Sequence, residues 1–180
     1  MLFRSQRRLG GPPGGRTAPA PEATSPTRLA VVPREGAPQS ELRIGHLSAR
    51  RNTPDYPALL VMNAVLGGEF VSRINLKLRE EKGYTYGARS GFDWRRGMAP
   101  FSLQASVHTA STADAISDCL AEFDGIRGSR PPSAREMSLA KASLTRGYPR
   151  SFETAQQVAR SLEADEIGRA SCRERVYDDV

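Results

Sequence analysis

Four short stretches of the chain have the apolar content or the strict alternation of strands. These stretches are residues 28–32, 39–47, 86–93 and 101–108. In the second stretch, Leu42, Ile44 and His46 share the apolar face, so we expect His46 to be a core histidine. The fourth stretch alternates most regularly, and His108 falls on its polar face. The pattern therefore predicts four strands in two consecutive pairs.

Elsewhere, apolar residues recur every three or four positions, which predicts amphipathic helices. The predicted helices run from Thr53 or Asp55 to Leu66, cover residues 72–79, 112–126 and 133–144, and begin again near Phe152. Either Thr53 or Asp55 has a side chain that can cap the first helix. Ser133 and Glu136 have the spacing of a capping box, which marks a helix start. Gly83 is predicted to turn the chain from the second helix into the third strand.

The predicted order is two strands, two helices, two strands and three helices. Such an order is typical of an α+β fold, an antiparallel sheet with helices packed on one face. We expect one domain over residues 27–165. Residues 1–26 are rich in Pro, Gly and Arg and have the composition of a disordered linker. Residues 166–180 resemble a translated sequencing adapter, with a genuine polar tail as the alternative.

Composition excludes several classes of protein. No stretch approaches the roughly 18 continuous apolar residues of a membrane span, and no apolar segment of a secretory signal follows the first charged residues. The two cysteines, Cys119 and Cys172, do not form a disulfide scaffold. The net charge of +6 comes from scattered arginines, without the stacking aromatics of a nucleic-acid-binding module. That module stays a distant alternative.

Three stretches of the sequence together resemble one family. They are LGGEFVSR at 66–73, LREEKGYTYG at 78–87, and EMSLA at 136–140 followed by FET at 152–154. These stretches are similar to the insulinase/pitrilysin-type zinc metallopeptidases, and most similar to bacterial relatives of the mitochondrial processing peptidase. The resemblance implies the metallohydrolase half-fold of LuxS and the processing peptidases. It also implies two homologous halves that enclose a chamber, in which the N-terminal half holds zinc through an HxxEH helix.

The only histidines of this chain are His46 and His108, and neither belongs to an HxxEH sequence. A zinc site of that kind needs two histidines one helical turn apart and a glutamate as base. The chain thus resembles the non-catalytic C-terminal half, and we expect it to be inert alone. The resemblance implies no cofactor in this chain, zinc in an N-terminal half or partner subunit, and a peptide as substrate. Family members occupy several compartments, so no localisation follows.

In this family the C-terminal half supplies an arginine and a tyrosine, with six residues between them, that contact the scissile peptide. Arg79 and Tyr86 match that spacing. A guanidinium and a phenol are suitable donors to the negative charge that develops on the carbonyl oxygen. Tyr84 competes for this role, because residues two apart share a strand face. Without the resemblance, Arg79 is a helix-end cation and Tyr86 a half-buried strand aromatic.

Gly67 and Gly68 correspond to a glycine-rich loop near the substrate entrance of related processing enzymes. The alternative is a helix C-cap with a glycine in the left-handed conformation, which needs no ligand. For the whole chain, the alternative to a half of a larger peptidase is a stand-alone inactive subunit that pairs with a zinc-bearing chain.

Overall fold

The computed structural model describes residues 27–95 and 97–164. Its strands are β1 (Gln39–Leu47), β2 (Thr85–Phe92) and β3 (Pro100–His108). They form an antiparallel sheet in the order β1-β3-β2. The predicted segments 1–26 and 166–180 lie outside the described residues.

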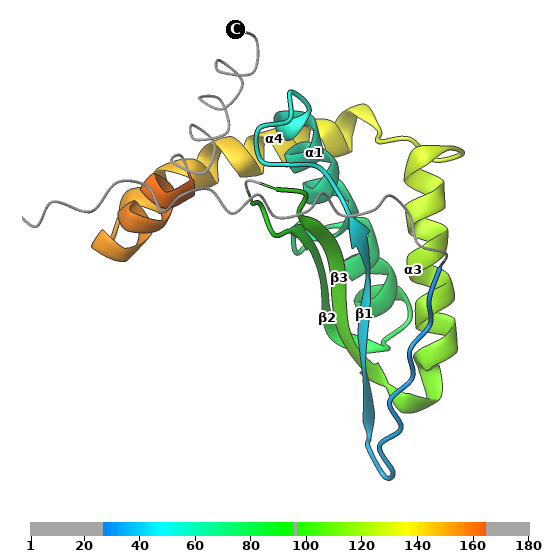
Figure 1. The fold of residues 1–180 in the computed structure, drawn as a ribbon. Helices are drawn as coiled ribbons and strands as arrows, with labels where there is room; N and C mark the ends of the chain where they lie inside the picture. Colours follow the sequence, from blue (N-terminus) through cyan, green and yellow to red (C-terminus); the bar gives the residue numbers. More distant parts are fainter. Residues whose placement is uncertain (1–26, 96, 165–180) are drawn as a thin grey trace, which may run out of the picture.

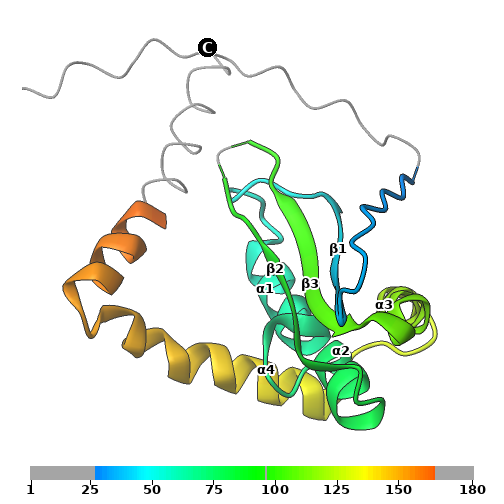
Figure 2. The same cartoon turned by 90° about the horizontal axis from the view of Figure 1, so that it is seen from below.

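Two helical segments precede β2, and each changes from an α-helix to a π-helical turn. They are α1 (Tyr56–Asn63) with η1 (Ala64–Gly68), and α2 (Arg73–Asn75) with η2 (Leu76–Glu81). After β3 come η3 (Thr109–Ser111), α3 (Thr112–Arg127), α4 (Ala134–Gly147), η4 (Tyr148–Phe152) and a helix over 155–164. The helices α1, α2 and α3 lie on one face of the sheet (Figure 1), and α4 crosses beside α1 (Figure 2). The predicted α+β class is confirmed.

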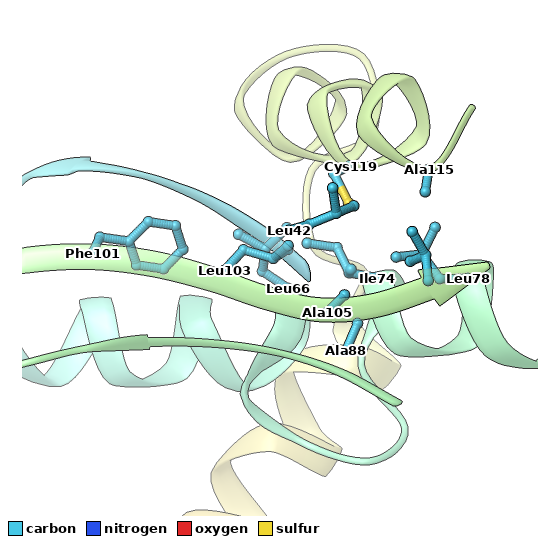
Figure 3. Close-up of a cluster of buried hydrophobic side chains, with 11 residues drawn as sticks. Leu42, Leu66, Ile74, Leu78, Ala88, Phe101, Leu103, Ala105, Ala115 and Cys119 are labelled. Atoms are coloured by element: carbon cyan, nitrogen blue, oxygen red, sulfur yellow. The ribbon is translucent and has the colours of Figure 1, made fainter. Parts of the chain in front are cut away.

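The main core lies between the sheet and these helices (Figure 3). Its buried residues are Leu42, Leu66, Ile74, Leu78, Ala88, Phe101, Leu103, Ala105, Val107, Ala115 and Cys119. The strand β3 contributes every second residue from Phe101 to Val107, as its alternation predicts. Because β3 is the central strand, this row of side chains organises the core.

The predicted strand at 28–32 is wrong. These residues are not in a strand, and Leu29, Val31 and Val32 are largely exposed. Within the described part of the chain, β1 pairs only with β3. An apolar run becomes a strand only when another strand satisfies its backbone groups, and this run has no such partner among residues 27–95 and 97–164.

The prediction of a core histidine at His46 is also wrong. The imidazole is exposed, and its Nδ1 lies 2.7 Å from the Leu47 carbonyl oxygen. His46 pairs with Phe101 near the end of the sheet, and the two rings are 5.8 Å apart. Phe101 fills the core at that position. His46 therefore lies on the core-facing side of the sheet, as alternation predicts, but beyond the helices that would bury its ring.

Local signals for helix starts and turns are mostly confirmed. Ser133 and Glu136 form a capping box, in which Glu136 N–H donates to the Ser133 hydroxyl at 3.3 Å. Gly83 has a φ of +66°, which suits the predicted turn. Asp55 occupies the N-cap position of α1, but its side chain makes no capping hydrogen bond.

One helical stretch, Tyr56–Glu81, is long and apolar enough to cross a membrane by length and composition alone. Residues 69–72 interrupt its helix, and an interrupted helix leaves backbone groups unpaired in lipid. Leu66, Ile74 and Leu78 from this stretch are buried in the main core. Core packing therefore accounts for its apolar character.

Candidate functional site

Gly67 and Gly68 form the end of η1, but neither has the left-handed backbone of the expected C-cap. Gly67 is glycine because of close packing: a Cβ there would lie 2.3 Å from the Ser90 hydroxyl oxygen on β2. At Gly68, a Cβ would lie 2.5 Å from the Asn63 amide nitrogen. The glycine pair therefore lets the helix end approach β2 and Asn63 closely.

A two-point hydrogen bond joins α1 to β2 at the same place. The Asn63 amide donates to the Ser90 carbonyl oxygen at 3.2 Å, and the Ser90 hydroxyl donates to Asn63 Oδ1 at 2.7 Å. Both side chains are at least half-buried. This pair holds the glycine-rich turn against the strand, directly before the loop 69–72.

Asn75 connects that loop to the start of β2. Its amide donates to the Phe70 carbonyl oxygen at 2.6 Å, and its Oδ1 accepts from the Ala88 N–H at 2.9 Å. Asn75 is buried, so both bonds are shielded from water and costly to lose. One side chain thus orients two segments that carry predicted site residues.

Tyr86 lies on a β-bulge. The pairing of β2 with β3 shifts between Thr85 and Ala88, which adds a residue to β2. The Thr85 hydroxyl braces the bulge, donating to the Ser106 carbonyl oxygen at 2.6 Å and accepting from the Gly87 N–H at 3.1 Å. Tyr86 itself is 87% exposed. The expectation of a half-buried aromatic is therefore wrong, and its phenol is presented to solvent.

The other phenol, Tyr84, lies in a different environment. It precedes β2, is half-buried and packs against the main core. Its carbonyl oxygen accepts from the His108 N–H at 2.9 Å. The prediction that Tyr84 and Tyr86 share a strand face does not hold, because β2 begins at Thr85 and the bulge follows at once.

Arg79 lies near the end of η2 and faces the loop 69–72. Its guanidinium carbon is 4.4 Å from the centre of the Phe70 ring, a cation–π geometry. Its Nε is 3.3 Å from the Glu80 carboxylate. Phe70 is 61% exposed, so this stacked pair lies at the surface. Through Asn75, the Phe70 backbone is tied to the bulge that carries Tyr86.

A charged cleft of about 630 Å³ lies beside α2 and η2, with walls from α3 and α4. In it, Arg73 binds Glu136 at two points, with Nε–Oε1 at 2.6 Å and Nη2–Oε2 at 2.8 Å. Arg130 pairs with the buried Glu122 at 3.0 Å. Glu136 raises the pKa of Arg73 by hydrogen bonding. These groups neutralise each other in pairs, which is the arrangement of a structural network.

The part of the chain that the structure describes offers no fit for the family's zinc. His46 pairs with Phe101 and His108 pairs with Gln39, so the histidines lie at opposite ends of β3, roughly 24 Å apart at the usual rise per residue. No group of three or more His, Cys, Asp or Glu in residues 27–95 and 97–164 is placed to hold a metal. Burial also raises the pKa of the Cys119 thiol to about 12, which leaves it protonated and unreactive.

Asn75 is the residue that sequence reasoning missed. It is a polar residue between the core positions Ile74 and Leu78. A polar residue on the buried face of a helix needs a hydrogen-bond partner, and that signal was visible in the sequence. Its partners were not, because they lie in a loop and in a strand.

Comparison with known proteins identifies the family. The sequence model of the peptidase M16 inactive domain matches residues 4–144. Among curated protein sequences, none matches the chain significantly. The chain shares 25% identity with the crystal structure of a peptidase M16 inactive domain from Pseudomonas fluorescens, with a TM-score of 0.61. That match covers 74% of this chain and 30% of the other.

Two further structures share the fold. A protease from Helicobacter pylori has 19% identity and a TM-score of 0.69, and a conserved protein from Enterococcus faecalis has 21% identity and a TM-score of 0.66. Each match covers 82% of this chain and 35% of the other. The chain thus spans about a third of the length of the structures it matches. The resemblance to insulinase-type peptidases is confirmed: this chain belongs to the peptidase M16 inactive-domain family.

Proposed function

We propose that this chain is the substrate-closing, non-zinc-binding half of a zinc metalloendopeptidase. The observation that carries the proposal is the match of residues 4–144 to the peptidase M16 inactive domain. The position of the two histidines at opposite ends of β3 supports it, because the zinc-bearing half needs them on one helix. In this proposal the zinc, and the water it activates, belong to a partner half that encloses the peptide together with this chain.

Arg79 and Tyr86 contact the scissile peptide in this proposal. Negative charge develops on the carbonyl oxygen when water attacks it, and donors held in place stabilise that charge. The 87% exposure of Tyr86 leaves its hydroxyl accessible to a bound peptide. Phe70 restrains Arg79 by stacking, so its guanidinium needs little further ordering when it binds. Gly67 and Gly68 lie near the substrate entrance in the same proposal, and Tyr84 is the phenol that competes with Tyr86 for contact with the peptide.

Reconstitution tests the proposal. The chain is mixed with a zinc-bearing half of the same family, and hydrolysis of a quenched fluorescent peptide is followed. We expect chelator-sensitive hydrolysis only when both halves are present. Equal hydrolysis by the zinc-bearing half alone would overturn the closing role.

The second candidate is a stand-alone inactive subunit of a larger assembly. A chain of complex III2 from Candida albicans shares the fold, with 17% identity and a TM-score of 0.60, and that protein works within a complex. The flanking genomic sequence separates the two candidates. An in-frame HxxEH sequence upstream supports one half of a single peptidase, whereas an independent start and stop support a separate subunit.

A further inference from the structure

The sheet has one face that none of the described helices covers, the face turned away from α1 and α2 (Figure 1). We call it the open face. Residues that pair across neighbouring strands point to the same side of the sheet. The register of the strands therefore determines which residues form each row across the open face. Alternate residues of β3 point into the core, so their neighbours Ser102, Gln104 and Ser106 occupy the open face.

An arginine stands on each side of the central row. Arg43 of β1 and Arg89 of β2 both pair with Gln104 of β3, which puts the three side chains in one line across the sheet. All three are exposed. Adjacent strands are about 4.8 Å apart, so the two arginine backbones are about 10 Å apart. Gln104 lies between the two arginines in this row.

The two guanidiniums are not neutralised within the described chain: neither Arg43 nor Arg89 has an ion-pair partner there. Glu41, an acid on this face, accepts a hydrogen bond from Ser106 in the neighbouring row. Two unpaired guanidiniums in a row favour an incoming carboxylate, which each can bind at two points.

One of the two rows beside the arginines consists of small residues. On one side the row consists of Gly45, Ser102 and Gly91, which pair with each other across the sheet. Because the side chains of this row are small, the guanidiniums of Arg43 and Arg89 project above the surface beside them. A chain laid along the sheet can therefore reach them without displacing a bulky neighbour.

Tyr86 shares the open face. Thr85 pairs with the core residue Val107 and is buried, so the following residue turns to the other side, in agreement with the exposure of Tyr86. The bulge takes up one residue, so the three steps from Tyr86 to Arg89 cover about two rows of β3, roughly 7 Å or the length of about two peptide residues.

We propose that the open face binds an acidic side chain of an extended peptide through Arg43 and Arg89, about two residues from the peptide bond that Tyr86 contacts. This inference rests on the proposed function, and it adds a substrate class: peptides with Asp or Glu at that distance from the cleaved bond. Arg43 and Arg89 recognise the carboxylate by charge and by hydrogen bonds to both of its oxygens.

The test is peptide binding by the full chain, measured by fluorescence anisotropy at low salt. The probes are two labelled extended peptides that differ only in carrying glutamate or glutamine at the acidic positions. We expect the glutamate peptide to bind roughly fivefold more tightly, since exposed ion pairs contribute modestly. Arg43→Gln and Arg89→Gln should each reduce this preference, and the double variant should abolish it. Arg135→Gln, an exposed arginine on α4, is the matched control and should keep the preference.

Three results of the peptide experiment would overturn the inference. They are equal binding of the two peptides, no peptide binding, and a preference that survives in the double variant. Tighter binding of single-stranded DNA that depends on the same two arginines would also overturn it, in favour of a nucleic-acid surface. None of these results bears on whether the two halves hydrolyse a peptide when they are reconstituted. If reconstituted hydrolysis succeeds without an acidic preference, the closing role stands and only this inference falls.

Discussion

Arg73 on α2 and Glu136 on α4 form a two-point ion pair, with Nε–Oε1 at 2.6 Å and Nη2–Oε2 at 2.8 Å. Arg73 also donates to the carbonyl oxygens of Arg130 and Pro131, at 2.6 and 3.1 Å. The Glu136 carboxylate accepts in turn from the N–H of Ser133 at 2.8 Å. One salt bridge therefore joins the helix before β2, the loop after α3 and the start of α4.

This ion pair makes stability depend on pH. The pKa of Glu136 falls from its ordinary 4.5 to about 2, first because Arg73 donates to it and also because Ser133 does. The ionised carboxylate thus stabilises the fold above about pH 4.5, and this contribution is lost as pH falls from about 4.5 to about 2. Urea unfolding between pH 7 and pH 2 measures it.

In the same measurement, Glu136→Gln should cost about 2 kcal/mol near pH 7, as expected for hydrogen bonds to charged groups. It should also flatten the pH dependence below about pH 4.5. Glu153→Gln, at an exposed position, is the control and should leave both unchanged. If the Arg73–Glu136 pair does not contribute to folding, the Glu136→Gln variant and the parent chain will lose stability equally in acid.

Gly67→Ala should destabilise the chain by about 1–3 kcal/mol, the usual cost of overpacking. Its new Cβ would lie 2.3 Å from the Ser90 hydroxyl oxygen and 2.9 Å from the Ser90 Cβ. Gly91→Ala is a matched control on β2, because nothing lies within 4 Å of its Cβ position, and it should change stability by less than about 0.5 kcal/mol. Thermal unfolding compares the two, and equal stability would refute the close packing of η1 on β2.

Asn75→Ala should expose the Ala88 amide to exchange, since that N–H would lose its acceptor. The variant also leaves the Phe70 carbonyl oxygen without its donor, and we expect a total cost of about 2–3 kcal/mol for the buried groups. Hydrogen exchange followed by NMR measures the Ala88 amide directly. The Leu103 amide in the centre of the sheet is the internal reference. Unchanged protection of Ala88 would mean that Asn75 does not hold the bulge.

Tyr86→Phe in the reconstituted peptidase should lower kcat on the order of 10²-fold, the usual effect of losing one donor to the developing oxyanion. Arg79→Lys should also lose activity, because an ammonium does not reproduce a planar guanidinium. Tyr84→Phe is the control: its ring packs on the core, and phenylalanine keeps that packing. A loss of activity in Tyr84→Phe but not in Tyr86→Phe would assign the role to the other phenol.

The purified chain should bind no stoichiometric zinc and cleave no peptide, because its two histidines lie at opposite ends of β3. Elemental analysis after dialysis measures the metal, and a peptide assay with and without chelator measures hydrolysis. One tightly bound equivalent of zinc would contradict the assignment to the non-catalytic half.

The sequence by itself determined the features that depend on near neighbours. Alternation along 101–108 predicted β3 and its buried row, and Ser133 with Glu136 predicted the start of α4. The stretches 66–73 and 78–87 predicted the family. Helix periods, caps and turns are governed by residues within about four positions, so a linear reading detects them.

Only the tertiary structure decided the rest. The run 28–32 does not form a strand because it has no partner strand in the described chain, and His46 is exposed because no described helix covers it. Gly67 must be a glycine because Ser90, on another element, lies too close for a Cβ. Asn75 binds residues in a loop and in a strand, while the bulge that exposes Tyr86 arises from pairing with β3. Burial and pairing depend on groups brought together from distant parts of the chain, and no local pattern records which groups those are.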